Sequence, residues 1–464
     1  MGSLDSLDPA KALQPAELLL ARARFQGLTV ISAVTERRVE GGLASSWKAS
    51  ADATRYEFVL REGLRSSDGS PITSGAVRAW FDRLARRSTG SPHAFVLSQI
   101  VGFREVNLLG SRRQLRGIDT PTPRKIVFRL SAPFSEFPVM LAHPAAGIVP
   151  GPGEKFGPSR ASTGPFVLRE VELGRRAVLE RNLTSRGPTA LLERIELRVV
   201  QDGARALRAR TVDVAYVRGE ANLDATVSPV WATLSLGVNL GRLGDLSARR
   251  AIRLALDLET LSQKGPRGVP APGLVPGSIL PAPQAPRRDP VEARERWSRA
   301  NKPASRLRLV HLNDDPSREL MAEVRRQLNA AGIPARTVPV SPAAYPRVLA
   351  EKRFDLIQLG WLAEVPSPDG FLAGQLLSTS VDNKTGFQDD AFDQAIARAR
   401  RTVDPGQRLE AYASAQQRAL GQLPNIPLIH LVTRIQGTER LRGLVPDGSG
   451  SFDPATVWLA PIVA

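Results

Sequence analysis

The side chains that could carry out chemistry in this chain are few and widely spaced. Cysteine is absent, which excludes disulfides, thiolate nucleophiles and thiolate metal sites. The four histidines are His93, His143, His311 and His430, and none of them belongs to a closely spaced ligand pair such as H-x-x-x-H. We therefore interpret each histidine as an isolated surface or core side chain, and we expect neither a metal site nor a cofactor.

Hydroxyl and carboxylate side chains are numerous, but they form no catalytic motif. Hydrolysis needs a nucleophile paired with a base, or a metal cluster. Neither a G-x-S-x-G nor an H-E-x-x-H motif occurs, and scattered carboxylates alone are not specific. We therefore expect no catalytic residue and predict that the protein is not an enzyme.

An alternation of predicted strands and helices between residues 307 and 359 indicates where a ligand would bind. The predicted elements are a strand over 307–311, a helix between Pro316 and Gly332, a strand from Val338, a short helix over 342–352 and a strand over 354–359. Such an alternation predicts right-handed crossovers and a mostly parallel sheet. Ligands bind beyond the carboxyl ends of the strands of such sheets, so we expect the loop after Leu359 to contact a ligand.

That loop, residues 360–369, has the sequence GWLAEVPSPD. Trp361 offers enough aromatic area to form the floor of a pocket, and packing in the core is the alternative. We interpret Asp369 as a cap for the helical segment that begins at Phe371.

Net charge and length limit the class of protein. The chain of 464 residues has a net charge of +17, from 63 Lys and Arg against 46 Asp and Glu. The arginines are dispersed and have no interleaved aromatic residues, which disfavours nucleic acid as a partner. A weak attraction to an anionic membrane surface is more plausible.

Apolar and basic residues along the chain bear on whether it carries a targeting signal. No stretch of about 18 apolar residues occurs, so we expect no membrane span. The first residues have neither a basic region nor an apolar region of a signal peptide. We expect a mature sequence from which an export signal or a lipoprotein anchor has been removed.

The segment 55–77, RYEFVLREGLRSSDGSPITSGAV, predicts a strand, a turn and a helix in that order. Apolar side chains alternate along the first six residues, which is typical of a half-buried strand. Gly69 follows in a turn that favours a positive φ, and Thr73 or Ser74 can cap the helix. One apolar helical face is predicted from Val77, Trp80, Phe81 and Leu84.

This segment resembles the Y-x-F-x-L-R-x-G…S-D-G-x-P-x-T signature of the family 5 extracellular solute-binding proteins, the peptide- and nickel-type binding proteins of bacterial ABC importers. Further segments resemble the family in the same order along the chain. They are Leu7-Asp8-Pro9, 42–47 (GLASSW), 162–166 (STGPF), 212–215 (VDVA), 246–257 (LSARRAIRLALD) and 424–428 (PNIPL). The resemblance runs from about Leu7 to Trp458.

The resemblance also implies which residues bind the ligand. Residues 360–368 are similar to the family segment G-W-x-[AG]-D-Y-x-x-P, whose acidic residue pairs with the α-ammonium group of a peptide in peptide-binding members. Here that residue is Glu364, which is one methylene longer than the usual Asp. A carboxylate removed from water needs a cation. We predict Gly360, Trp361, Ala363 and Glu364 as ligand-binding residues, and a solvated loop position is the alternative for Glu364.

The fold that the resemblance implies is α/β, with two lobes of the periplasmic-binding-protein type (type II, cluster C), a two-strand hinge and a cleft between the lobes. Residues 1–225 would form lobe 1, with an extra subdomain at about 30–160. Residues 226–430 would form lobe 2, and residues 431–464 would return to lobe 1.

The implied function is that of an extracytoplasmic solute-binding protein of an ABC importer. It would capture a short peptide or another amine-bearing or cationic solute and deliver it to a permease. We expect a monomer. It would lie in the periplasm, or outside the cell and attached to a membrane surface through a lipoprotein anchor that these residues do not include. The alternative is a ligand-sensing module of the same fold; a fused DNA-binding or membrane domain would favour it, and none is recognisable in these residues.

Overall fold

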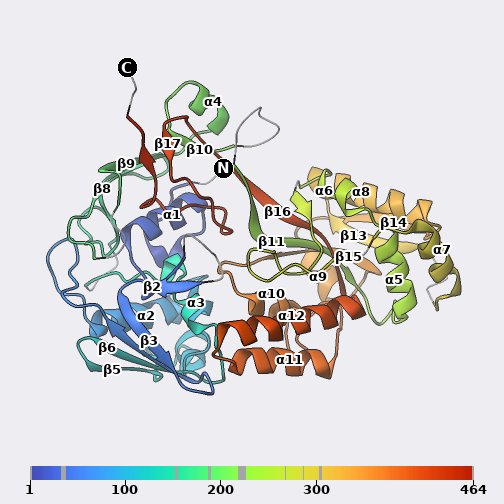
Figure 1. Cartoon of the computed structure of the whole chain (residues 1–464), viewed down its shortest axis with the longest axis horizontal. Helices are drawn as coiled ribbons and strands as arrows, with labels where there is room; N and C mark the ends of the chain where they lie inside the picture. The colour runs from blue at the N-terminus through green and yellow to red at the C-terminus, as the bar shows by residue number, and fades with distance from the viewer. Residues whose placement is uncertain are drawn as a thin grey trace. The chain divides into compact units, whose positions relative to one another are not determined.

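The chain divides into two compact units, each of which is described by itself (Figure 1). The computed structural model describes residues 3–32, 38–151, 155–186, 190–217, 226–266, 268–285, 287–301 and 306–461. Unit 1 comprises Met1–Ser228, Arg400–Val403 and Thr433–Ala464, and unit 2 comprises Pro229–Ala399 and Asp404–Val432. The predicted lobe boundary at residue 225 lies outside the described residues, and the extra subdomain stays a prediction.

Unit 1 contains short helices and small antiparallel sheets. Its helices are α1 (Pro15–Arg24), α2 (Ser74–Ala85), α3 (Phe137–Met140) and α4 (Gly203–Arg208), with a π-helical turn at Arg104–Leu108. Its strands are β1 (Thr29–Ile31), β2 (Val39–Gly41), β3 (Ala44–Ala49), β4 (Arg55–Leu60), β5 (Ile118–Thr122), β6 (Lys125–Arg129), β7 (Phe166–Glu172), β8 (Arg176–Arg181), β9 (Arg194–Arg198), β10 (Val214–Tyr216), β17 (Leu441–Arg442) and β18 (Trp458–Leu459). The sheets have the orders β1-β2, β3-β4-β6-β5, β7-β8-β9 and β17-β18.

The strand, turn and helix predicted between residues 55 and 85 are confirmed. Tyr56, Phe58 and Leu60 are buried along β4, and the four apolar residues predicted on one face of α2 are buried as well. Gly69 has φ +84°, the left-handed conformation that glycine adopts without strain. Thr73 is the N-cap residue of α2, but its side chain makes no capping hydrogen bond, so this part of the prediction is wrong.

Unit 2 is built on a larger sheet flanked by helices. Its helices are α5 (Leu246–Ala255), α6 (Leu258–Ser262), α7 (Pro290–Arg299), α8 (Asp315–Ala330), α9 (Tyr345–Ala350), α10 (Pro368–Leu376), α11 (Asp390–Arg401), which extends past Ala399, and α12 (Pro405–Gln422). Its strands are β12 (Gly268–Pro270), β13 (Leu307–Leu312), β14 (Ala335–Val340) and β15 (Leu356–Leu362). Two long strands, β11 (Thr226–Val238) and β16 (Asn425–Gly437), each run from one unit into the other.

This sheet has the order β10-β16-β11-β15-β13-β14, with β12 paired to β16. Strand β13 is parallel to β14 and to β15, as the predicted crossovers require. Strand β15 is antiparallel to β11, and β16 is antiparallel to β10 and β12. The prediction of a mostly parallel sheet is therefore wrong, because the strands that carry the chain between the units pair with their neighbours in the opposite direction.

Helices cover both faces of the sheet in unit 2. One buried apolar cluster joins the sheet to α5, α6, α7 and α8, and a second joins it to α10, α11 and α12. The strand β11 contributes to both clusters, since Leu236 and Val238 belong to the first and Trp231 belongs to the second. This two-sided burial gives β11 and β15 a rigid base for the candidate site.

Candidate functional site

The segment that carries the predicted ligand-binding residues begins on a strand and not in a loop. Strand β15 continues to Leu362 because it pairs with β11 in an unbroken register, in which Gly360 lies opposite Leu234 and Trp361 lies opposite Thr233. The prediction that the strand ends at Leu359 is therefore wrong. The four predicted residues straddle the end of β15, where the strand gives way to the connection that leads into α10.

Trp361 packs against α10 and keeps part of its surface exposed. Its indole joins the apolar cluster around Phe371. Gly374 makes this contact possible, since a Cβ atom on Gly374 would lie 2.5 Å from Cζ2 of Trp361. Core packing was the alternative for Trp361. One side of the indole packs in this way, and the rest stays exposed.

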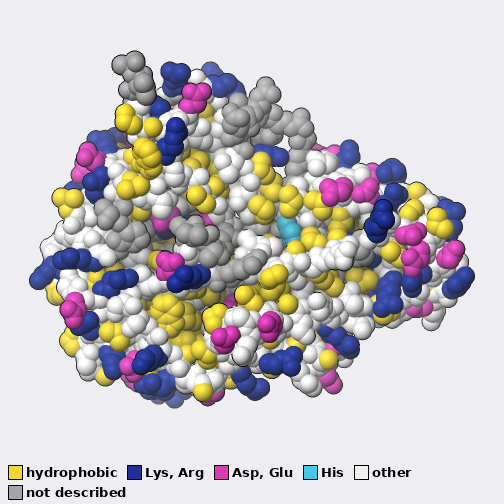
Figure 2. All heavy atoms as spheres, viewed as in Figure 1, with side chains coloured by type: hydrophobic (Ala, Val, Ile, Leu, Met, Phe, Trp, Pro, Cys, Tyr) yellow, Lys and Arg dark blue, Asp and Glu magenta, His cyan; other side chains and the backbone are white. Residues whose placement is uncertain are grey.

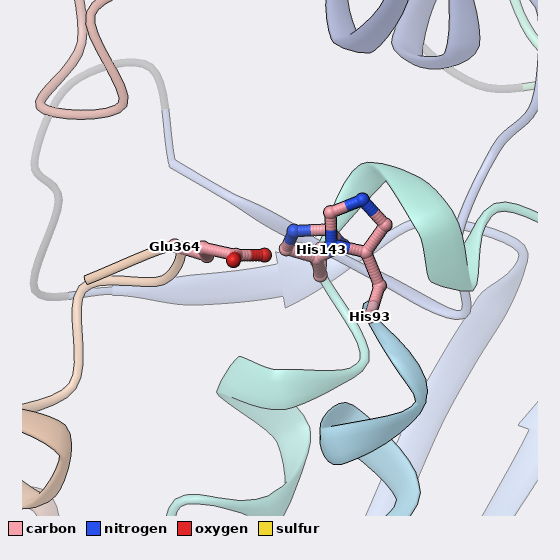
Figure 3. Close-up of side chains that lie close together, drawn as sticks. All are labelled: His93, His143 and Glu364. Atoms are coloured by element: carbon pink, nitrogen blue, oxygen red, sulfur yellow. The ribbon is translucent and has the colours of Figure 1, made fainter. Parts of the chain in front are cut away.

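Ala363 and Glu364 follow the last residue of β15. The N–H of Ala363 donates to the carbonyl of Trp231 at 2.8 Å, which extends the pairing with β11 by one residue, and Ala363 is buried. Glu364 is exposed, and Figure 3 shows its side chain on the connection after β15. The strand thus presents a carboxylate from a connection that is fixed at one end by backbone pairing.

Asp369 fixes the other end of this connection, in a way that differs from the prediction. The N-cap residue of α10 is Ser367, and Asp369 lies within the first turn of the helix. Its Oδ1 accepts a hydrogen bond of 3.1 Å from the hydroxyl of Tyr412 on α12. Asp369 therefore ties α10 to α12 instead of capping a helix that begins at Phe371.

Thr233 and His430 form a polar contact next to Trp361 that the sequence did not predict. Thr233, opposite Trp361 on β11, has its Oγ1 2.9 Å from Nδ1 of His430 on β16. The Thr233 hydroxyl donates to the carbonyl of Leu274 at 3.0 Å. No sequence motif indicates this contact, because it depends on the register of two strands that are distant in the sequence.

The hydrogen bonds of Thr233 fix the tautomer of His430. A threonine hydroxyl has one hydrogen, which here goes to Leu274, so Nδ1 of His430 must be the protonated ring nitrogen. Nε2 is then an acceptor, and it is buried without a hydrogen-bond partner among the described residues. Burial lowers the pKa of His430 to about 4, so the ring is neutral at pH 7.

Two further histidines lie side by side in unit 1 (Figure 3). His93 and His143 are both buried, with ring centroids 4.7 Å apart. Nε2 of His93 contacts the carbonyl oxygen of Ala12, and Nδ1 of His143 accepts the N–H of Ala145 at 3.1 Å. The interpretation of these two histidines as isolated side chains is therefore wrong.

Charged side chains of both signs lie on the face of the molecule drawn in Figure 2. Figure 2 shows Lys and Arg spread over the visible face, with Asp and Glu among them. Many of these groups form exposed ion pairs, such as Arg169 with Glu180 at 2.8 Å and Arg347 with Glu351 at 2.7 Å. Among the described helices, none combines the length and the apolar character needed to cross a bilayer.

Comparison with known proteins shows similarity along nearly the whole chain. The protein is 26% identical to the glutathione-binding protein GsiB of Escherichia coli (strain K12), over 97% of this chain and 92% of GsiB. It is also 26% identical to the periplasmic oligopeptide-binding protein OppA of Salmonella typhimurium, over 92% of this chain and 86% of OppA.

A solved structure has the same fold. The periplasmic murein tripeptide binding protein MppA, in an unliganded open form, superimposes with a TM-score of 0.90 over 99% of this chain and 96% of MppA, at 21% identity. This confirms the predicted α/β fold of the periplasmic-binding-protein type.

Residues 38–383, well over half of the chain, match the family described as "Bacterial extracellular solute-binding proteins, family 5 Middle". This match confirms the resemblance on which the sequence predictions rest. The chain therefore belongs to the family 5 bacterial extracellular solute-binding proteins, and it is a binding protein and not an enzyme.

Proposed function

We propose that this protein captures a short peptide, or another amine-bearing or cationic solute, and delivers it to the permease of an ABC importer. The observation that carries the proposal is the similarity, over more than 90% of the chain, to GsiB and OppA, whose names state that they bind glutathione and oligopeptides. The protein would act in the periplasm or at the outer face of a membrane, as a monomer. A lipoprotein anchor ahead of these residues would hold it at that surface.

Glu364 would pair with the ammonium group of the solute, beside Gly360, Trp361 and Ala363. Three features support this assignment. The carboxylate is exposed, the strand before it is fixed by pairing with β11, and the helix after it is tied to α12 through Asp369. A carboxylate held in this way loses little conformational entropy when a cation binds, which favours affinity.

Beside the strand pair that carries Trp361, His430 offers a buried acceptor that a bound water would satisfy. Its unprotonated Nε2 is buried without a donor among the residues that the structure describes. Leaving such an acceptor unsatisfied costs about 1–3 kcal/mol. A donor N–H or a water molecule at Nε2 would therefore be stabilising.

Calorimetric titration of the purified protein with short peptides tests this function, after native mass spectrometry has identified any retained solute. We expect Glu364→Gln to weaken binding by about 2–5 kcal/mol, the usual cost of breaking a desolvated charge pair. The matched control is Glu295→Gln on α7, an exposed glutamate elsewhere in unit 2. Unchanged affinity in Glu364→Gln would remove Glu364 from the site, and failure to bind any amine-bearing solute would contradict the function.

A further inference from the structure

Unit 1 contains a cavity whose walls are mainly arginine. It is open to solvent and has a volume of about 690 Å³. Helix α2 contributes Arg78, and its C-cap residue is Arg86. The segment after the π-helical turn contributes Arg112, Arg113 and Arg116. None of these residues belongs to the segment that carries Glu364, so the cavity is a separate feature.

Hydrogen bonds fasten the two walls of the cavity to each other. Nε of Arg86 donates to the carbonyl of Arg113 at 3.1 Å, and Nη1 of Arg78 donates to the carbonyl of Ile118 at 2.6 Å. The N–H of Leu115 donates to Oδ1 of the buried Asp82 on α2 at 2.7 Å. The arginines are therefore presented by a segment that is anchored to the helix.

The positive charge of the cavity is only partly balanced. Oδ2 of Asp82 lies 3.7 Å from Nε of Arg78, and Oε1 of Glu105 lies 2.9 Å from Nη2 of Arg116. The charge of Arg86 also acts on Asp82, and Arg112 and Arg113 form no ion pair with a carboxylate within the described part of the chain. Five guanidinium groups against two carboxylates leave an excess of three positive charges.

We propose that this cavity is a binding site for a phosphate-bearing anion. Guanidinium groups are planar and bind phosphate through paired hydrogen bonds, and like charges gathered in one concave surface attract a multivalent anion. The unpaired Arg112 and Arg113 would make the main contacts, and Arg86 would orient them through the carbonyl of Arg113. The site is independent of the proposed capture of an amine-bearing solute.

Two exposed leucines next to the arginine cavity raise the question whether the phosphate belongs to a lipid. Leu108 and Leu109 are 61% and 55% exposed, and the carbonyl of Leu108 accepts a hydrogen bond of 3.2 Å from Nη1 of Arg87, the neighbour of Arg86. Apolar side chains next to a basic cluster are typical of contact with an anionic bilayer. The phosphate could thus belong to a lipid headgroup or to a soluble molecule, and both sources share the same chemistry.

Calorimetric titration with sodium pyrophosphate at low ionic strength tests the site. We expect saturable binding that Arg112→Ala/Arg113→Ala weakens at least about tenfold, because each guanidinium makes charge-assisted hydrogen bonds. The matched control is Arg287→Ala/Arg288→Ala, an exposed arginine pair in unit 2 whose loss changes the net charge equally. The proposal is overturned if the wild-type protein binds neither pyrophosphate nor phosphatidylglycerol vesicles, or if both double variants lose the same affinity.

Co-sedimentation with vesicles separates the two sources. Binding to phosphatidylglycerol vesicles but not to phosphatidylcholine vesicles, with a loss in Leu108→Ser/Leu109→Ser, would assign a lipid headgroup. Saturable pyrophosphate binding without vesicle binding would assign a soluble phosphate compound. If neither ligand binds, the site does not exist, whatever the outcome of the peptide titrations.

Discussion

At the scale of single residues, His430 makes stability depend on pH. Burial lowers the pKa of this ring to about 4, from the ordinary value near 6.5. The unfolded chain therefore binds a proton at His430 before the folded chain does, as the pH falls. This contribution to stability is fully present above about pH 6.5 and is lost progressively as the pH falls toward 4.

We predict that His430→Gln removes this part of the pH dependence. The free energy of unfolding of the wild-type protein should fall by about 2 kcal/mol more than that of the variant between pH 7 and pH 5. Urea denaturation at both pH values measures the difference. The control is His311→Gln, which replaces another buried histidine of the same sheet. Equal pH dependence in the wild-type protein and in His430→Gln would show that the ring is protonated as readily when folded.

Glu364 and His430 differ in whether the sequence alone can point to them. Glu364 could be proposed because residues 360–368 resemble a family segment whose acidic residue falls at this position, and such a resemblance is local information. His430 could not, because its contact with Thr233 joins positions 197 residues apart and depends on the pairing of β11 with β16. The stacking of His93 and His143 escaped prediction for the same reason, since no spacing rule describes contacts made by tertiary folding.

At the scale of elements, the packing of β15 against α10 decides where Glu364 lies. The contact depends on a glycine, because Cζ2 of Trp361 occupies the space that a side chain on Gly374 would need. Any larger residue at Gly374 would displace either the indole or the helix.

We predict that Gly374→Ala destabilises the protein by about 1–3 kcal/mol, as overpacking of a core does. Gly370→Ala in the same helix is the matched control, because a Cβ atom there would meet no other atom within 4 Å. The control should be neutral or slightly stabilising, since alanine favours helix. Denaturation followed by tryptophan fluorescence compares the two variants. Equal stabilities would contradict the packing described for Trp361.

A second prediction at this scale concerns helix caps. Asp404 accepts the N–H of Gln407 at 2.8 Å at the start of α12, whereas Thr73 makes no such bond at the start of α2. Asp404→Ala should therefore cost about 1 kcal/mol of stability and Thr73→Ala much less. Thermal denaturation of both variants checks this difference, and a larger loss in Thr73→Ala would contradict the assignment of the caps.

Sequence patterns predict the type of most elements and leave their limits open. The apolar alternation in β4 and the helical periodicity in α2 are local, and both elements were correctly predicted. The end of β15 and the mixed direction of the sheet depend on pairing with β11, which no local pattern in β15 reveals. The short strand β12 lies in a segment rich in proline and glycine and forms because it pairs with β16.

At the scale of the whole molecule, two strands carry the chain between its units. Both β11 and β16 continue from one unit into the other. The resemblance to family 5 implies a hinge of two strands, and hinges absorb ligand-driven motion in a few residues. Binding of a solute should therefore make the molecule more compact. Small-angle X-ray scattering with and without a bound peptide measures this, and an unchanged radius of gyration at saturation would contradict a closing hinge.

The central claim is that this protein holds a solute through its amine, and one calorimetric comparison tests it most directly. A short peptide that binds the protein is titrated with a free amino terminus and again with an acetylated amino terminus. We predict tight binding of the free form, and a loss of about 2–5 kcal/mol on acetylation, because Glu364 would then have no cation to pair with. Equal affinity for the two forms, or no binding of any short peptide, would contradict the claim.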